Sequence, residues 1–250
     1  MRKTLERSGS LWVPSRREML GALGVGLLAP RMARAAAFGL IAHTGAALGV
    51  NGGTSGSTDT SGATLLIVCV ASHPGMSLTL SDSKSNTWTG LTLASSPDLR
   101  IYYASPPGNK AGSGHTVTVT GTDIYTGVCF ASFSGADLSA PFDGQQSGHA
   151  AGSGDTPGSI TPAENNALVI SAASGNGDTR IISDGSMMLL DGFPLTSGVN
   201  YSGSMAYVIQ TTAAAIDPVW TTPAGGACAI ASFKPGVGGK VWHRVISGGE

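Results

Sequence analysis

The chain has few charged residues, few aromatic residues and only three cysteines among its 250 residues. An odd number of cysteines cannot form a closed set of disulfides, which argues against a small disulfide-stapled scaffold. Cys69, Cys129 and Cys228 each lie within an apolar run. We therefore expect buried thiols that act as small hydrophobic side chains, with a single disulfide left open as the alternative.

The sequence also lacks the short motifs of common catalytic and metal sites. It contains no G-x-S-x-G, no C-x-x-C and no H-x-x-x-H segment, and its five histidines are scattered. After residue 37 the only glutamates are Glu164 and Glu250, so glycoside hydrolysis would have to recruit aspartates that stand beside turns. We therefore expect a protein that is not an enzyme, without catalytic, cofactor-binding or metal-binding residues.

Two segments resemble ligand sites only in part. Asp82-Ser83-Lys84-Ser85-Asn86 places oxygens at alternate positions, but Lys84 stands at a ligand position and Thr87 where a calcium loop needs glycine. We interpret it as a hairpin turn between strands at 76–81 and 87–93. His115 is expected to end a strand with one nitrogen in water, and the alternative is a metal ligand or a catalytic base. No cofactor is predicted, although a structural calcium ion between surface loops stays open.

The N-terminus contains two adjacent arginines, an apolar run of about a dozen residues and then small residues. This segment resembles a bacterial twin-arginine export signal. The resemblance predicts cleavage after Ala35 or Ala37. The residues that carry the motif are Ser15, Arg16, Arg17, Met19 and Leu20.

This resemblance implies recognition by the twin-arginine translocase and a periplasmic or extracellular location. The apolar run is too short for a stable membrane anchor, which needs roughly 20 residues. The first 37 residues hold seven of the 14 Lys/Arg and two of the 15 Asp/Glu, which leaves 7 basic and 13 acidic residues. A net charge of about −6 argues against nucleic acid as a partner.

Beyond residue 60 the pattern is that of strands separated by Gly, Asn, Asp, Ser and Pro. Thr64–Ala71 is continuously apolar, which is typical of a central strand covered on both faces. Gln145–Pro162 has no apolar pattern and predicts a long loop. Other expected strands lie at 99–104, 115–120, 126–133, 167–173, 187–190, 204–210, 219–222 and 227–233.

The second half of the chain repeats the first at a spacing of about 100 residues. Leu65–Val68 matches Ala167–Ile170, and residues 100–104 match residues 204–208. Residues 127–133 match 226–233, each segment ending in phenylalanine. We predict an all-β, jelly-roll-like antiparallel sandwich of two sheets, in which the halves share one core because two small domains would bury too little surface.

The predicted domains are an export signal (1–37), a Gly/Ser/Thr-rich lead-in (38–62), the sandwich (63–235, with halves 63–144 and 163–235) and a tail (236–250). Asp82–Trp88, Gly114–Val119 and Phe133–Asp137 make the sandwich similar to uncharacterised β-sandwich proteins of secreted bacterial and phage-associated sequences. That resemblance implies a fold and a location but no activity.

The remaining functional signal is aromatic. Seven aromatic side chains could stack on a sugar: Trp88, Trp220, Tyr102, Tyr103, Tyr125, Tyr201 and Tyr207. Core packing is the ordinary role of such rings. Trp88 and Trp220 lie near expected strand ends, where a ring can be presented to a ligand, and we select these two and Tyr125 as candidates. We therefore predict an exported binding module, with carbohydrate as a possible ligand, or an extracellular structural or adhesive protein. The alternatives are a secreted polysaccharide hydrolase and a subunit that assembles through exposed strand edges.

Overall fold

The computed structural model describes residues 37–105, 110–149, 156–177, 182–221 and 226–236. The export motif, Ala35 and the tail after residue 236 lie outside these residues. Within them, no helix has the length and apolar character needed to cross a membrane. The strands are β1 Gly39–Gly49, β2 Gly52–Thr54, β3 Leu65–Ser72, β4 Leu78–Asp82, β5 Thr89–Ala94, β6 Asp98–Ala104, β7 Val117–Gly121, β8 Thr126–Ser134, β9 Phe142–His149, β10 Ala167–Gly175, β11 Met188–Phe193, β12 Ser202–Gln210 and β13 Gly226–Phe233.

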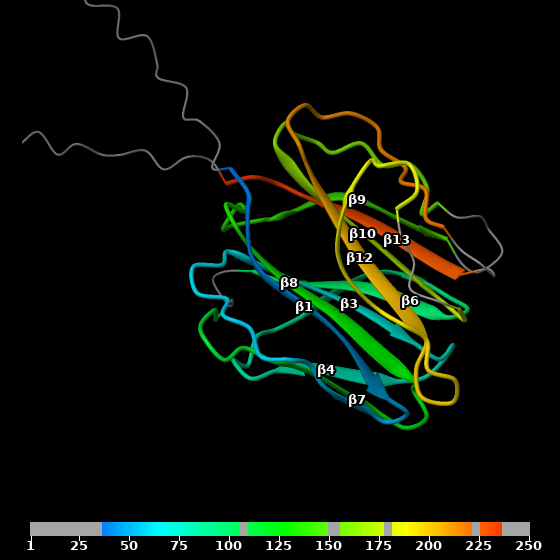
Figure 1. Ribbon diagram of the computed structural model, residues 1–250. Helices are drawn as coiled ribbons and strands as arrows, with labels where there is room; N and C mark the ends of the chain where they lie inside the picture. The colour runs from blue at the N-terminus through cyan, green and yellow to red at the C-terminus, as the bar shows by residue number, and fades with distance from the viewer. Residues whose placement is uncertain (1–36, 106–109, 150–155, 178–181, 222–225, 237–250) are drawn as a thin grey trace, which may run out of the picture. The chain divides into compact units, whose positions relative to one another are not determined.

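The strands form three antiparallel sheets. The first sheet has the order β1-β8-β3-β6-β5, the second β11-β12-β10-β13-β9, and the small sheet β2-β7-β4. The first and second sheets pack face to face (Figure 1), and one hydrophobic core, with side chains from both, fills the space between them. The predicted all-β antiparallel sandwich is therefore confirmed, but the prediction of two sheets did not include the small third sheet.

Strand β3 is almost continuously apolar because sheets cover both of its faces. Alternate side chains point to opposite faces of a strand. Leu65 and Ile67 point to the second sheet, whereas Leu66 and Val68 point to the small sheet. Because both faces are covered, every residue of β3 is buried. Strand β10 is buried throughout for the same reason, with loops rather than a sheet on its outer side.

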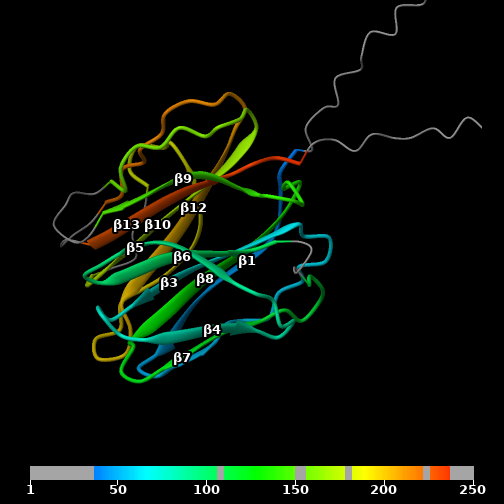
Figure 2. The same cartoon turned by 180° about the vertical axis from the view of Figure 1, so that it is seen from behind.

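The repeat extends to the order of strands. From its β1 edge the first sheet is β1-β8-β3-β6-β5, and from its β9 edge the second sheet is β9-β13-β10-β12-β11. Strands β1, β3, β5, β6 and β8 thus correspond, in chain order, to β9, β10, β11, β12 and β13. The three strands left over, β2, β4 and β7, form the small sheet, which covers the outer face of the first sheet (Figure 2).

The two halves contact each other reciprocally. Phe133 of the first half lies 5.6 Å from Tyr207 of the second, and Phe233 of the second lies 5.6 Å from Tyr103 of the first, measured between ring centroids. Likewise β1 contacts β11, and their counterparts β9 and β5 contact each other. This is the geometry of a two-fold symmetric dimer interface within one chain.

The register corrects one detail of the predicted repeat. Leu65 is paired with Phe133, and Leu168 is paired with Phe233. Leu65 therefore corresponds to Leu168, not to Ala167. The one-residue difference is decisive because it exchanges the core face of a strand for its outer face.

Two strands occupy segments predicted to be irregular. β1 lies within the lead-in of 38–62, and β9 lies partly within the Gln145–Pro162 loop. Both are edge strands, and each is the counterpart of the other. An edge strand has one neighbour and is covered less completely, so it can be built from Gly, Ala and polar residues without the apolar pattern of a central strand.

The predicted hairpin around Asp82–Asn86 is wrong. β4 pairs with β7 in the small sheet, and β5 pairs with β6 in the first sheet. The turn therefore carries the chain from one sheet to another, because a local turn signal does not select the partner of either strand. The predicted strand at 219–222 is also absent from the described residues, where Trp220 makes only an isolated bridge with Ile182.

All three cysteines are buried. Cys69 and Cys129 are free thiols at paired positions of β3 and β8, and both belong to the core between the sheets. Burial raises the pKa of both thiols above the ordinary value, which keeps them protonated and unreactive. The predicted role of small hydrophobic side chains is confirmed for this pair.

Candidate binding site

A cleft of about 240 Å³ opens where loops from both halves of the sandwich meet. His73 follows β3, Tyr125 precedes β8 and Tyr201 precedes β12. The ring of His73 lies 5.9 Å from that of Tyr125 and 6.1 Å from that of Tyr201, centroid to centroid. Other lining residues are Asn176, Leu195, Ser197, Gly198 and Asn200.

Backbone hydrogen bonds hold these three rings in place. The Tyr201 amide donates to the Tyr125 carbonyl at 3.1 Å, and the His73 amide donates to the Ile124 carbonyl at 2.7 Å. The Tyr125 amide donates in turn to the Val50 carbonyl at 3.0 Å. The loops of the two halves are therefore fixed to each other at the point where the rings converge.

Tyr125 has a backbone φ of 46°, in the left-handed region that a bulky side chain rarely adopts. Such a conformation persists only where surrounding contacts impose it, and it clusters at binding and catalytic sites. Here the hydrogen bonds of its amide and carbonyl impose it. The consequence is that the ring is held at the cleft rather than packed into the core.

Some polar groups of the cleft form hydrogen bonds within the protein, and others are available to a ligand. Asn200 is buried, and its amide donates to the carbonyls of Pro194 and Tyr201 while its oxygen accepts from the Thr196 amide. The His73 Nδ1 atom lies 3.2 Å from the Pro74 carbonyl, which leaves Nε2 for a ligand. Asn176 is exposed at the rim. No carboxylate is among the described residues that line the cleft.

The three aromatic residues predicted to stack on ligands lie in different environments. Tyr125 is half-exposed and lines the cleft. Trp88 lies elsewhere, partly buried against Phe130 with a centroid distance of 6.4 Å. The prediction for Trp220 is wrong, because its ring is fully buried and its Nε1 donates to the Ser171 hydroxyl at 3.0 Å. Trp220 covers the outer face of the second sheet, a position that the sequence pattern could not reveal.

His73 of the cleft was not predicted as a site, and Tyr201 was only one of seven aromatic side chains considered for stacking on a sugar. His73 stands before Pro74 and Gly75, a combination that indicates a turn and nothing more. Tyr201 is 76 positions after Tyr125 in the sequence. Only the packing of the two sheets brings Tyr125 and Tyr201 together. The one available signal was their shared position, since each stands next to the end of a strand.

A second polar cluster surrounds Asp82, whose side chain is fully buried. Its Oδ1 accepts from the Lys84 amide at 2.7 Å, and its Oδ2 accepts from the Trp88 indole at 2.7 Å. The Asn86 amide donates to it as well, at 3.3 Å. Both carboxylate oxygens are thus occupied by N–H donors, which is the chemistry of a turn and not of a calcium site. No group of three metal-ligating side chains occurs in the described part of the chain.

His115 lies on the same cluster and is fully buried, so the predicted contact with water is wrong. Its Nδ1 is 2.8 Å from the Thr60 hydroxyl, and its Nε2 is 3.4 Å from Asp82 Oδ1. The latter is a close electrostatic contact without hydrogen-bond geometry. Burial lowers the pKa of His115, and the Asp82 carboxylate opposes that effect. The cluster therefore ties the small sheet to the loop before β3 and is a structural element.

No protein-family model matches this chain, and neither a curated protein nor a solved structure does so.

Proposed function

We propose that this protein is an exported, non-catalytic β-sandwich module that binds carbohydrate in the cleft formed by His73, Tyr125 and Tyr201. The observation that carries the proposal is the convergence of three aromatic rings on one cleft between loops of both halves. Aromatic rings offer apolar faces with polar edges. The C–H face of a sugar packs on such rings while its hydroxyls bond with groups at their edges.

The size of the cleft limits the ligand. Its volume of about 240 Å³ lies below the roughly 300–1,000 Å³ of sites for drug-sized molecules. We infer that it takes one or two sugar rings, such as the end of a glycan chain. The absence of carboxylates among the described lining residues favours binding over hydrolysis, because glycosidases need a pair of acids.

Screening residues 38–250 on a glycan array, with and without calcium, tests the proposal directly. Tyr201→Ala and Tyr125→Asn are expected to weaken binding about tenfold each, equivalent to about 1.4 kcal/mol. Asparagine is chosen at 125 because it tolerates the left-handed backbone.

The control is Leu138→Ala, because Leu138 is 57 % exposed and does not line the cleft. Its binding should equal that of the wild type. Glycan binding that survives both cleft substitutions, or that is lost in the Leu138 control, contradicts the assignment of the cleft. Release of a reducing end from any bound glycan contradicts the non-catalytic role.

Export by the twin-arginine route is part of the proposal. The sandwich begins at Phe38, whose side chain is 5 % exposed and belongs to the central core, directly after the proposed cleavage sites. Replacing Arg16 and Arg17 together by lysine should leave the full-length precursor in the cytoplasm, as cell fractionation and immunoblotting would show. Undiminished export of this variant would point instead to the general secretory route.

A further inference from the structure

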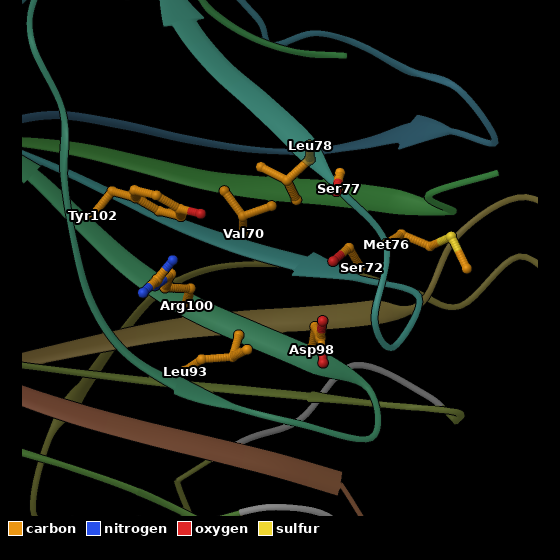
Figure 3. A pocket seen from close by; sticks show the side chains of 9 residues that line it. All are labelled: Val70, Ser72, Met76, Ser77, Leu78, Leu93, Asp98, Arg100 and Tyr102. Atoms are coloured by element: carbon orange, nitrogen blue, oxygen red, sulfur yellow. The ribbon is translucent and has the colours of Figure 1, made fainter. Parts of the chain in front are cut away.

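A second hollow, separate from the aromatic cleft, lies on the outer face of the first sheet. It has a volume of about 250 Å³ and is bounded by β4 on one side and by β5 and β6 on the other (Figure 3). The small sheet ends at β4, so it covers the outer face of β6 only in part: Asp98 is buried, whereas Arg100 and Tyr102 are half-buried. The lining residues are Val70, Ser72, Met76, Ser77, Leu78, Leu93, Asp98, Arg100 and Tyr102.

Arg100 is the distinctive group of this groove. Its Nε donates to the Leu91 carbonyl at 2.7 Å, and its guanidinium lies 5.7 Å from the centre of the Tyr102 ring. Among the described residues, no carboxylate oxygen lies within 4 Å of it. Asp98 is on the same face of β6, and its Oδ2 instead accepts from the Gly75 amide at 2.9 Å. A half-buried guanidinium is thus fixed through Nε while its two terminal nitrogens lack an anionic partner.

The repeat provides an internal comparison for this groove. The register of β3 with β6 and of β10 with β12 makes Asp98, Arg100 and Tyr102 equivalent to Ser202, Ser204 and Ala206. In the second half these positions are buried, and Trp220 covers that face with its indole bonded to Ser171. Strand β12, the counterpart of β6, therefore folds with small residues at all three positions. Strand β6 instead carries two charged residues and an aromatic ring at a face that is covered only in part.

We propose that this groove binds the carboxylate of a small ligand, with the anion on Arg100 and the rest of the molecule against the apolar side chains. Arginine is suited to this role because its planar fork pairs with both oxygens of a carboxylate. Leu93 is 46 % exposed and Met76 is 40 % exposed, and both line the groove with Leu78. These side chains favour a ligand whose carboxylate adjoins an apolar group. The proposal does not depend on glycan binding in the aromatic cleft.

Calorimetric titration of the folded protein with hexanoate, against hexanamide, tests the requirement for a carboxylate. Hexanoate should bind at least about tenfold more tightly than the uncharged amide, since the amide cannot form an ion pair. The second comparison titrates glucuronate and its uncharged analogue glucose in the same way. Binding of glucuronate alone supports carboxylate recognition and identifies a sugar acid as the source, whereas equal binding of each acid and its neutral analogue overturns the proposal.

Substitutions at Leu93 locate the site without removing a structural bond. Leu93 is the cross-strand partner of Arg100, so Leu93→Glu would supply an internal carboxylate to the guanidinium. This variant should bind hexanoate or glucuronate at least about tenfold more weakly than Leu93→Gln, which has the same shape without charge. Binding of neither acid at about 10 mM, or affinity unaffected by Leu93→Glu, overturns the proposal.

Discussion

Phe133→Ala and Phe233→Ala will each lower the same single unfolding transition. Both side chains are fully buried in the core between the sheets, and truncation of a buried phenylalanine typically costs about 3–5 kcal/mol. Each ring contacts a tyrosine of the opposite half, Tyr207 for Phe133 and Tyr103 for Phe233. Either truncation therefore damages the contact between the halves as well as one half itself.

Scanning calorimetry of residues 38–250 is the appropriate measurement. A single sandwich of this size should unfold as one cooperative unit, and the midpoint should fall in both variants. Leu138→Ala is the control, because Leu138 is 57 % exposed and such substitutions usually change stability by less than about 0.5 kcal/mol. Two separable transitions, each sensitive to one substitution only, would show instead that the halves fold independently.

Asp82→Ala should be the most damaging substitution of a polar residue. It removes a fully buried carboxylate that accepts hydrogen bonds from the Lys84 amide and from the Trp88 indole, and it leaves His115 without its acidic neighbour. Removing one member of such a buried group costs about 3–5 kcal/mol, because the remaining polar atoms stay buried without partners. Urea denaturation followed by tryptophan fluorescence would measure the loss.

A matched surface turn provides the control for Asp82. Asp137 likewise accepts from a backbone amide two positions later, that of Ser139, at 2.7 Å, but at an exposed site. Asp137→Ala should cost about 1 kcal/mol or less, because water replaces the lost acceptor. Equal losses for the two alanine variants would show that burial of the Asp82 cluster does not contribute to stability.

The cluster also predicts a pH dependence. Burial lowers the pKa of His115 from its ordinary value of 6.5, so the unfolded chain binds this proton more readily than the folded one. The contribution of His115 to stability is therefore full above about pH 6.5 and decreases as the pH falls below that value. His115→Gln should reduce the dependence of the unfolding free energy on pH between about pH 7 and 5, compared with the wild type.

The sequence alone was sufficient for the fold class and for most of the central strands. The sequence pattern predicts the central strands β3, β8, β10 and β13 directly, because burial on both faces requires an unbroken apolar run. Their repetition along the chain also indicated two related halves. Edge strands β1 and β9 were not predicted, because a strand with a single neighbour is covered less completely and needs no apolar pattern.

The binding surfaces were decided by tertiary structure. Tyr125 and Trp220 both look like rings beside strand ends, yet one lines a cleft and the other is fully buried. Nothing local distinguishes them, since the difference is whether another segment covers the ring. Arg100 and Ser204 differ in the same way: they occupy equivalent positions, but Arg100 is half-buried in a groove whereas Ser204 is buried. Residue type and periodicity determine which side chains can be buried, whereas the packing of segments distant in sequence determines which are.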